Sequence, residues 1–332
     1  MMRPKLDPAG FHSRVSLAPH QLSSDVTPRE DLIVLCHVGV PRIERLDWSL
    51  TVDGLVQKPA RLAFADLSRF RQRHVSAIHE CAGSPLAPQE PKRRITNVEW
   101  KGVLLADLLE ECGLSADANY IWSIGADYGE FAGVSIDEYV KDLPIERLSD
   151  DVLIATELNG EPLTPEHGFP ARLVVPGFYG TNSVKWLTRV SLQKKRAQGP
   201  FTTRWYNDVV LDEHGRATGQ MKPVWNVAPE SVIVSPAPSA QLSIDQPCEV
   251  WGRAWGDTPI EVVEVSFDEG ETWMRTFPST RLSRSWQRFS IEWKPRRKGI
   301  HQLMSRAWDS RGNVQPPKGA RNAIYSVQVE VV

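Results

Sequence analysis

The sequence predicts a mixed α+β domain followed by a smaller, all-β domain. First, the chain has 332 residues, and a single hydrophobic core stops growing at roughly 250–300, so two domains are expected. Second, its 25 prolines disfavour an all-helical chain and suit edge strands, turns and long loops. Third, strand-like segments recur along the whole chain, whereas clear helical periodicity is confined to its first part.

The N-terminal part is predicted to consist of short elements. Residues 1–30 are polar and irregular, which is typical of an extension that wraps a surface. The apolar run 32–41 (LIVLCHVGVP) favours a buried strand. The segment 48–56 alternates in polarity and carries the pair Asp53-Gly54, which indicates a β-hairpin.

One helix stands out in the next part of the chain. Residues 103–114 place apolar side chains on one face, and Gly113 suits the C-cap. A shorter helix is predicted at 64–70, and residues 74–83 are predicted as a strand that runs into a turn of small residues. The remaining strands are expected at 120–127, 151–160, 171–177 and 183–192. No GxGxxG follows a strand, so a Rossmann nucleotide site is not supported.

The domain boundary is expected in the proline-rich stretch 222–239 (KPVWNVAPESVIVSPAPS). The sequence after this stretch has only strand-like patterns, with strands predicted at 248–256, 260–273, 285–293, 300–309 and 325–332. Their near-even spacing suits a sandwich of about 100 residues, immunoglobulin-like in size. The sequence is therefore divided into an extension (1–30), a catalytic domain (31–225) and a β-sandwich (226–332).

Composition excludes several classes of function. Lys plus Arg total 39 and Asp plus Glu total 41, a formal charge of −2, so no broad basic field for nucleic acid exists. No stretch approaches the roughly 20 apolar residues of a membrane span. The N-terminus lacks an apolar signal region, so a cytoplasmic location is expected, with a trimmed periplasmic protein as the alternative. The four cysteines form no CxxC or CxxCH, which excludes a c-type haem on this chain.

Cys81 is the first candidate for chemistry. It ends an apolar strand in HECAGSP, where small residues let a large group approach the sulfur closely. A buried structural cysteine is the commoner interpretation of such a pattern. The functional interpretation is a thiolate ligand, because soft sulfur binds soft or high-valent metals.

A second candidate is the segment 160–192. It places His167, Arg172 and Lys185 around turns rich in Gly and Pro. Cations held at fixed positions suit a phosphate or an anionic ring. A solvated charged loop is the alternative, but the intervening residues (FPARLVVPGF) are apolar and favour burial.

These residues carry a resemblance to the sulfite oxidase family. HECAG followed by VEWKGVLLADLLEECGL resembles the family's cysteine segment, and HGFPARLVVPGFYGTNSVKWLTRVSL resembles its long cofactor-binding signature. VSFDEGETW, RAWD and NVQP are similar to phrases of its dimerisation domain. The resemblance covers roughly residues 30–330 and implies a molybdopterin-binding domain of mixed α+β fold, followed by an immunoglobulin-like domain that forms a homodimer.

The resemblance also implies a molybdenum atom held by a pterin dithiolene and one protein thiolate, here Cys81. The family's cofactor-contacting positions map onto His37, Asp127, His167, Arg172 and Lys185. Trp100 and Tyr206 fall near positions that line its substrate pocket, and with Cys81 they are the expected catalytic residues. The b-type haem domain of animal members has no counterpart here, so a separate electron acceptor, such as a cytochrome, is expected.

The chain departs from the family at its substrate pocket. Sulfite-oxidising members carry arginines where this sequence has Leu35 and Leu86, and Cys36 replaces an asparagine. Losing two charged hydrogen bonds at about 1.5–3 kcal/mol each lowers affinity for a doubly charged oxyanion by orders of magnitude. We therefore expect sulfite to be a poor substrate unless Lys92, Arg93 or Arg94 supplies the missing charge.

The leading hypothesis is two-electron oxygen-atom transfer on a small, neutral or singly charged substrate. One alternative is a reductase of an S- or N-oxide, which runs the same chemistry in the opposite direction. The other is a two-domain binding protein without catalysis. Molybdenum content separates the last from both enzymes, and assays with sulfite against sulfoxide or nitrate separate the two directions.

Overall fold

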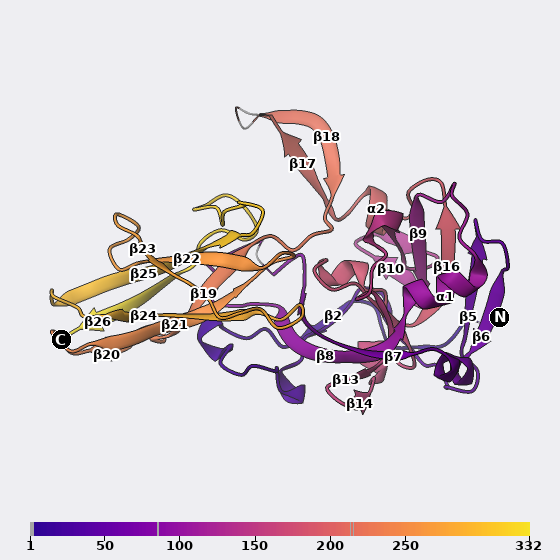
Figure 1. The fold of residues 1–332 in the computed structure, drawn as a ribbon, viewed down its shortest axis with the longest axis horizontal. Helices are drawn as coiled ribbons and strands as arrows, with labels where there is room; N and C mark the ends of the chain where they lie inside the picture. The colour runs from indigo at the N-terminus through magenta and orange to yellow at the C-terminus, as the bar shows by residue number, and fades with distance from the viewer. Residues whose placement is uncertain (1–2, 85, 213, 215) are drawn as a thin grey trace. The chain divides into compact units, whose positions relative to one another are not determined.

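The computed structural model describes residues 3–84, 86–212, 214 and 216–332. Most of its regular structure is β-strand (Figure 1). In the described part, the α-helices are α1 (Leu105–Cys112) and α2 (Pro200–Thr203), so helix contributes less than an α+β label suggests. Two compact units are present. Unit 1 holds residues 1–14, 34–75 and 99–225, and unit 2 holds residues 15–33, 76–98 and 226–332.

A five-stranded sheet forms the centre of unit 1, in the order β12-β9-β16-β5-β6. All neighbours are antiparallel except β16 and β5, which run parallel. Its strands supply buried apolar side chains to the large core cluster of this unit. The strand bounds are β5 Ser49–Gly54, β6 Ala60–Ala63, β9 Tyr120–Gly125, β12 Val140–Pro144 and β16 Leu187–Gln193.

A second sheet has the order β14-β13-β8-β7, and β15 also pairs with β13. Strands β7 and β8 each pass from one unit to the other, after Val75 and before Glu99 respectively. The long strand β8 was not predicted, because it begins in a charged stretch after a proline-rich loop. The bounds are β7 Gln72–Glu80, β8 Ile95–Leu104, β13 Leu153–Leu158, β14 Glu161–Pro162 and β15 Arg172–Val174.

Helix α1 lies where the apolar periodicity predicts it. Leu105, Leu108 and Leu109 are buried in the core of unit 1. The helix ends at Gly113, whose φ of +70° is open to glycine and strained for other residues. The predicted helix at 64–70 is a 3-10 helix, η3 (Phe64–Arg69). The other 3-10 helices described are η1 Pro19–Gln21, η2 Arg29–Asp31, η4 Ile145–Arg147, η5 Pro165–His167 and η6 Gly180–Asn182.

The single strand predicted at 32–41 is wrong. It is divided into β3 (Val34–Cys36) and β4 (Gly39–Pro41), with a bend between them. Gly39 has a φ of +115°, and a Cβ there would lie 2.7 Å from Pro8 O, so only glycine allows the break. The two halves pair with different partners, β3 with β2 (His12–Arg14) and β4 with β1 (Leu6–Ala9).

The predicted hairpin at 48–56 is present as β5 and β6, but its connection spans 55–59 rather than Asp53-Gly54. Gly54 instead approaches Leu192 closely, where a Cβ would lie 2.3 Å from the carbonyl oxygen. A small hairpin formed by β10 (Gly129–Phe131) and β11 (Val134–Ile136) follows Asp127. No strong local pattern in these residues predicts this hairpin.

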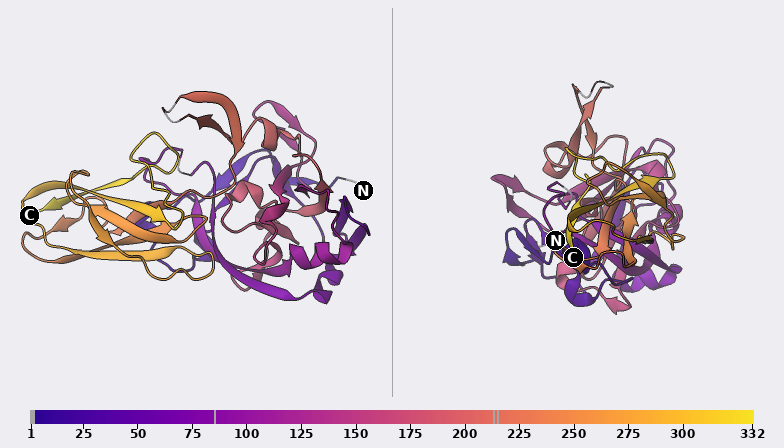
Figure 2. Two further views of the ribbon diagram at one scale, coloured as in Figure 1. Left: turned by 45° about the horizontal axis from the view of Figure 1, so that its top comes forward. Right: turned by 90° about the vertical axis from the view of Figure 1, so that its left-hand side faces the viewer.

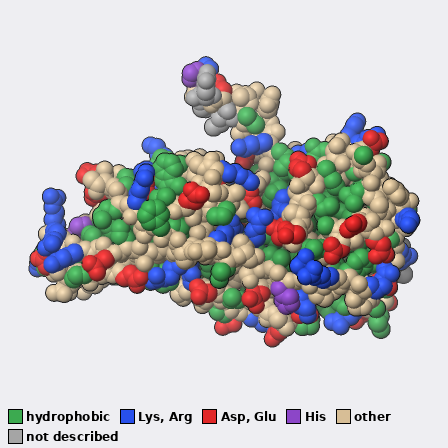
Figure 3. Space-filling view, viewed as in Figure 1, with side chains coloured by type: hydrophobic (Ala, Val, Ile, Leu, Met, Phe, Trp, Pro, Cys, Tyr) green, Lys and Arg blue, Asp and Glu red, His purple; other side chains and the backbone are tan. Residues whose placement is uncertain are grey.

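A hairpin of β17 (Asn207–Leu211) and β18 (Ala217–Pro223) projects from unit 1 (Figures 1 and 3). Val209 and Met221 face each other across it and are 46% and 57% exposed. Apolar and polar residues alternate only weakly in β17 and β18, because neither face of the hairpin is buried. The sequence therefore does not predict this hairpin. The residue before β17 is Tyr206, with a φ of +60°.

Unit 2 contains a β-sandwich, and Figure 2 shows its two sheets stacked. One sheet has the order β19-β21-β24 and the other the order β20-β26-β25-β22-β23. Buried residues of both sheets form one core cluster. The stretch 222–239 is more than a linker, because it includes β19. The bounds are β19 Glu230–Ser235, β20 Gln241–Leu242, β21 Cys248–Trp255, β22 Ile260–Ser266, β23 Met274–Thr276, β24 Gln287–Trp293, β25 Gly299–Asp309 and β26 Ser326–Val331.

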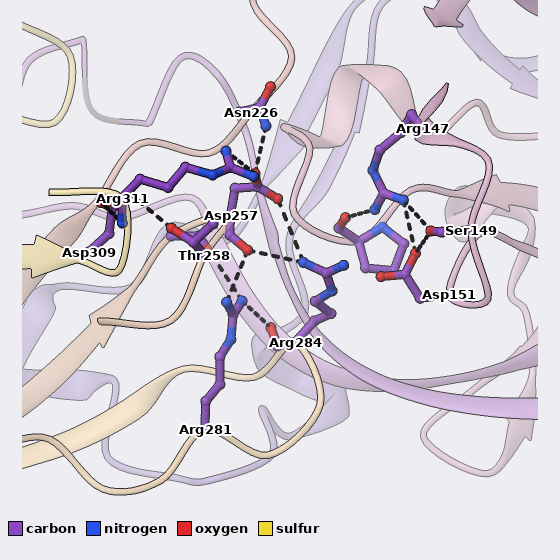
Figure 4. A network of polar contacts seen from close by, with 12 residues as sticks. Arg147, Ser149, Asp151, Asn226, Asp257, Thr258, Arg281, Arg284, Asp309 and Arg311 are labelled. Atoms are coloured by element: carbon purple, nitrogen blue, oxygen red, sulfur yellow. Dashed lines mark hydrogen bonds and ion pairs between the residues drawn. The ribbon is translucent and has the colours of Figure 1, made fainter. Parts of the chain in front are cut away.

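Arginines fasten loops within each unit (Figure 4). In unit 1, Arg147 Nη1 donates to Asp151 Oδ1 at 2.9 Å and so fixes the turn before β13. In unit 2, Asp257 Oδ2 accepts from Arg311 Nη1 at 3.2 Å, while Arg281 and Arg284 donate to the Asp257 carbonyl oxygen. Because these cations are bound to their own loops, they are structural rather than candidates for ligand binding.

Among the helices in the described part of the chain, none combines the length and the apolar character needed to cross a bilayer.

Candidate functional site

A buried arginine and a half-buried lysine lie close together in unit 1, on either side of a glycine. Arg172 is on β15, and Lys185 lies just before β16. Gly168, with a φ of +104°, packs between them, since a Cβ there would lie 3.1 Å from the Cβ atoms of both. Glycine at this point in HGFP therefore allows the two cationic side chains to stand next to each other.

Lys185 is held by backbone carbonyls and a sulfur atom. Its Nζ donates to Leu35 O at 2.9 Å, to Glu166 O at 2.9 Å and to Cys36 Sγ at 3.0 Å. Among the residues described, no carboxylate forms an ion pair with it. Burial lowers the pKa of Lys185, and the neighbouring Cys36 opposes that shift.

Arg172 is 3% exposed and lies over the ring of Trp100, with Cζ 4.9 Å from the ring centroid. Its Nη1 donates to His167 O at 3.0 Å and its Nη2 to Ser183 O at 2.9 Å. Burial lowers the pKa of Arg172 to about 9, so the guanidinium stays charged at neutral pH. These carbonyl partners fix its position.

His167, at the end of η5, is tied to its own turn. Its Nδ1 lies 2.7 Å from Thr164 Oγ1. Because the His167 carbonyl also accepts from Arg172, the turn and the cation are positioned together.

Asp127 follows β9 and is 4% exposed. Its Oδ1 has no hydrogen-bond partner. Burial raises the pKa of Asp127 to about 7, against the attraction of Lys185. Gly125 makes room for this carboxyl, because a Cβ there would lie 2.5 Å from Asp127 Oδ1. A buried acid with an unused oxygen is unusual in a folded protein and indicates a ligand-facing group.

His37 lies in the bend between β3 and β4 and is 9% exposed. Its Nε2 is 2.7 Å from the hydroxyl oxygen of Tyr206. Burial, and then the charges of Lys185 and Lys141, lower the pKa of His37 to about 3, so the ring is neutral. A neutral imidazole has one donor and one acceptor nitrogen, which suits the edge of a heterocycle.

Cys81 lies in unit 2, directly after β7. The Gly83 N–H donates to its Sγ at 3.4 Å. Burial raises the pKa of the Cys81 thiol, and the Gly83 N–H and the Arg94 guanidinium oppose the shift. Pro85, part of the small-residue motif, lies outside the described residues. In the described part of the chain, no three His, Cys, Asp or Glu side chains gather as a metal cage.

A buried acid pair lies beside this cysteine within unit 2. Arg93 Nε donates to Glu230 Oε1 at 2.8 Å, with both side chains almost fully buried. Glu80 is 1% exposed and accepts from Trp255 Nε1 at 3.0 Å. Burial, and then repulsion from Glu230, raise the pKa of Glu80. Arg93 therefore lies near both carboxyl groups and forms an ion pair with Glu230, so its role is structural.

The structure brings seven of the predicted residues into unit 1. Contacts join Trp100, Arg172 and His167, and a separate contact joins His37 to Tyr206. Asp127 and His37 both lie within the electrostatic influence of Lys185. Sequence reasoning missed Lys141, which is 1% exposed and lies 5.2 Å from the Tyr206 ring centroid. Nothing in VKDLP signals a buried lysine.

The residues of unit 1 fit an anionic pterin cofactor. Arg172 and Lys185 are cations held next to each other by backbone carbonyls, and a phosphate is bound by such groups. The unpartnered Asp127 Oδ1 offers an acceptor for a ring N–H. These observations on the side chains themselves support the ligand set that the sequence predicts.

Comparisons with known proteins agree with this chemistry. Residues 37–201 match the oxidoreductase molybdopterin binding domain, and residues 221–329 match the Mo-co oxidoreductase dimerisation domain. The sulfane dehydrogenase SoxCD from Paracoccus pantotrophus has 31% sequence identity and a TM-score of 0.80, over 94% of this chain and 82% of its own.

Two curated relatives cover most of this chain. A mitochondrial sulfite oxidase of Drosophila melanogaster is 28% identical over 351 residues, which is 92% of this chain and 59% of that protein. A nitrate reductase [NAD(P)H] of Betula pendula is 28% identical over 349 residues, 93% of this chain and 38% of its own length. The chain thus spans only part of these relatives. From the two domain matches and the likeness to SoxCD, it follows that the chain belongs to the sulfite oxidase family of molybdenum-dependent oxidoreductases.

Proposed function

We propose that this protein is a molybdenum-cofactor oxidoreductase that catalyses two-electron oxygen-atom transfer on a small substrate. The observation that carries the proposal is the pair of neighbouring cations, buried Arg172 and half-buried Lys185, together with the buried acid Asp127, whose Oδ1 has no hydrogen-bond partner among the described residues. In the oxidising direction, the substrate gains one oxygen atom that derives from water. Two protons and two electrons are released, and the electrons pass to a separate acceptor such as a cytochrome.

In this proposal Cys81 is the thiolate ligand to molybdenum, and His37, Asp127, His167, Arg172 and Lys185 hold the pterin. The cofactor supplies a centre that changes by two electrons and exchanges an oxygen atom. Arg172 and Lys185 bind its anionic end, because both are cations whose positions are fixed by backbone carbonyls. The Gly83 N–H, which already donates to Cys81 Sγ, steadies the sulfur as a thiolate.

Trp100 and Tyr206 are proposed to act at the substrate. Trp100 is 2% exposed and stacked under Arg172, so it fixes that cation and forms an apolar wall. Tyr206 shares a hydrogen bond with His37, which is neutral at physiological pH. Its hydroxyl group can therefore donate to or accept from a substrate while His37 holds it in place.

We further propose a homodimer formed through the sandwich of residues 226–332, with residues 31–225 as the cofactor domain. The match to a dimerisation domain supports this. Within residues 226–332, four of the large apolar side chains described are exposed by 50% to 74%, and such residues favour a protein contact. They are Met274, Phe277, Leu282 and Ile300. Figure 3 shows apolar side chains in the part of unit 2 that holds β22 and β25.

Metal analysis together with identification of the released pterin tests the function. The purified protein should contain about one molybdenum atom per chain, and Cys81→Ser should abolish turnover while far-UV circular dichroism stays unchanged, because a hydroxyl is a hard, weakly acidic ligand. Cys248→Ser is the matched control, since Cys248 is also a half-buried free cysteine of unit 2. Full turnover by Cys81→Ser would remove this residue from the ligand role.

A reductase of an S- or N-oxide is the second candidate, favoured by the likeness to a nitrate reductase. Steady-state assays with sulfite and an artificial acceptor, against sulfoxide or nitrate and an artificial donor, decide the direction. A purified protein without molybdenum or pterin would instead support a non-catalytic binding protein.

A further inference from the structure

Cys81 and Arg94 lie side by side in unit 2, at the neck of the loop that joins β7 to β8. The Cys81 N–H donates to Arg94 O at 2.9 Å, and the Arg94 N–H donates to Ser84 Oγ at 2.6 Å. These bonds tie the backbone of each residue to the other end of the loop. The position of Arg94 relative to the cysteine is therefore set by main-chain contacts.

The Arg94 guanidinium reaches the sulfur. A Cβ added to Gly83 would lie 3.6 Å from Arg94 Nη1 and 3.7 Å from Cys81 Sγ, so both groups border the same small space. Arg94 also lowers the pKa of the Cys81 thiol, against the larger effect of burial. Because a guanidinium has five N–H donors, a contact with one sulfur leaves others for a second acceptor.

The three consecutive cations of this loop differ in burial and in ion pairing. Arg93 is buried against Glu230 and donates to the carbonyl oxygens of the loop itself. Lys92 is exposed. Arg94 is half-buried, and none of the carboxylates described in the structure forms an ion pair with it. A cation that is partly removed from water without a counter-charge favours an anion as its partner.

The loop that holds Arg94 also carries an exposed apolar side chain. Leu86, in the same loop, is 66% exposed. It stands where sulfite-oxidising members of the family carry an arginine, so of the cations in the described part of this loop only Arg94 lies beside the sulfur. One fixed charge compensates one negative charge, and a second charge on a ligand would be desolvated without a partner.

We propose that Arg94 is the cation of an anion-binding subsite beside Cys81, and that this subsite selects a substrate with a single negative charge. The proposal rests on the proposed function, in which Cys81 marks the reacting centre. It assigns to Arg94 a role in recognising substrate, in addition to its contact with the sulfur.

Alkylation of Cys81 in the full-length, metal-free protein tests the subsite directly. The rates of reaction with anionic iodoacetate and neutral iodoacetamide are measured by mass spectrometry of the Cys81 peptide. The same thiolate attacks the CH₂ carbon of both reagents and displaces iodide, so the ratio of the two rates cancels any effect of Arg94 on the thiol pKa. Arg94→Gln should lower the iodoacetate-to-iodoacetamide ratio about five-fold, since one nearby charge in water is worth about 1 kcal/mol.

Lys92→Gln is the matched control, because it removes an exposed charge two residues away and should leave the ratio unchanged. Arg94→Lys should keep most of the wild-type ratio. An unchanged ratio in Arg94→Gln, or an equal fall in Lys92→Gln, would overturn the subsite. Circular dichroism of each variant confirms that the fold is retained.

Protection from iodoacetamide then defines the charge of the ligand. Methanesulfonate and sulfate have similar shapes but carry one and two negative charges. Methanesulfonate should protect Cys81 at least as well as sulfate, and Arg94→Gln should abolish protection by both. Ten-fold better protection by sulfate would contradict a singly charged ligand. These measurements need no metal, so a protein without molybdenum would refute the proposed function while the ratio still decides the subsite.

Discussion

The Nζ atom of Lys185 lies 3.0 Å from the sulfur of Cys36, a residue 149 positions earlier in the chain. The two side chains meet because β3 and the segment before β16 converge in unit 1. By the resemblance noted in the sequence, Cys36 replaces an asparagine of the family, so in this chain a sulfur atom contacts the lysine. The contact fixes the third hydrogen-bond donor of a lysine whose other two donors bind backbone carbonyls.

Removing the sulfur should destabilise the protein by leaving a buried ammonium donor without an acceptor. Cys36→Ala should lower the free energy of unfolding by about 1–3 kcal/mol beyond the loss from the cavity. Cys36→Ser keeps an acceptor and should lose less. Urea denaturation measures each value. Cys112→Ala, which deletes a buried thiol from the apolar face of α1, is the control for the cavity. Equal losses in Cys36→Ala and Cys36→Ser would show that the contact is not stabilising.

Arg172→Ala and Lys185→Ala should each lower cofactor occupancy, because each removes a charge-assisted bond worth about 1.5–3 kcal/mol. His167→Ala should act in the same direction with a smaller effect, since water can replace a neutral donor. Molybdenum and pterin content per chain measure occupancy. Arg189→Ala and Lys194→Ala are matched controls, because both remove exposed cations of the same unit. Unchanged occupancy in Arg172→Ala and Lys185→Ala would exclude this segment as the pterin site.

Gly168→Ala should disturb the site through its backbone and its neighbours. Gly168 has a φ of +104°, and an added Cβ would crowd Arg172 and Lys185 at 3.1 Å. We expect a loss of about 1–3 kcal/mol in stability, together with lower cofactor occupancy. Gly133→Ala separates the two causes, because Gly133 has a φ of +72° but no atom within 4 Å of an added Cβ. Normal occupancy in Gly168→Ala would show that the cations tolerate displacement.

Asp127 should make the stability of the metal-free protein depend on pH. Its pKa is about 7 in the folded chain and 3.8 ordinarily, so the folded state holds a proton that the unfolded state releases. The stabilisation is complete below pH 3.8 and is lost as pH rises through 7, with a slope of at most about 1.4 kcal/mol per pH unit. Asp127→Asn should remove this part of the slope in urea titrations from pH 4 to 8. Asp150→Asn, at an exposed position, should not. An identical slope in wild type and Asp127→Asn would contradict the raised pKa.

The full-length chain should sediment as a dimer at micromolar concentration, and deletion of residues 226–332 should give poorly soluble monomers. The reason is that a sandwich with exposed Phe277 and Leu282 leaves apolar surface in water unless a second copy covers it. Analytical ultracentrifugation measures both. A wild-type chain that stays monomeric at that concentration would count against the dimer.

The sequence by itself determined the parts of this protein that depend on local pattern. The spacing of apolar residues in 105–112 predicts the buried face of α1. The alternation of apolar and polar residues predicts the strands of the sandwich. The motif around Cys81 and the segment from His167 to Lys185 were sufficient to identify the family, because their residue types and spacing are long and specific. The break at Gly39 could have been anticipated only from its partners, since glycine is also common in unbroken turns.

Only the tertiary structure decided which charges the site can use. The sequence alone does not distinguish the three consecutive cations Lys92, Arg93 and Arg94. In the structure, Arg93 forms an ion pair with Glu230, which is 137 residues away in the chain, and so cannot bind a ligand. Cys36 acquires Lys185 as a partner, and Lys141 becomes buried beside Tyr206, through contacts of the same long range. Local pattern sets the conformation of the backbone. The charge state and the partner of a side chain depend on what the rest of the chain brings against it, because burial and nearby charges together determine its electrostatic energy.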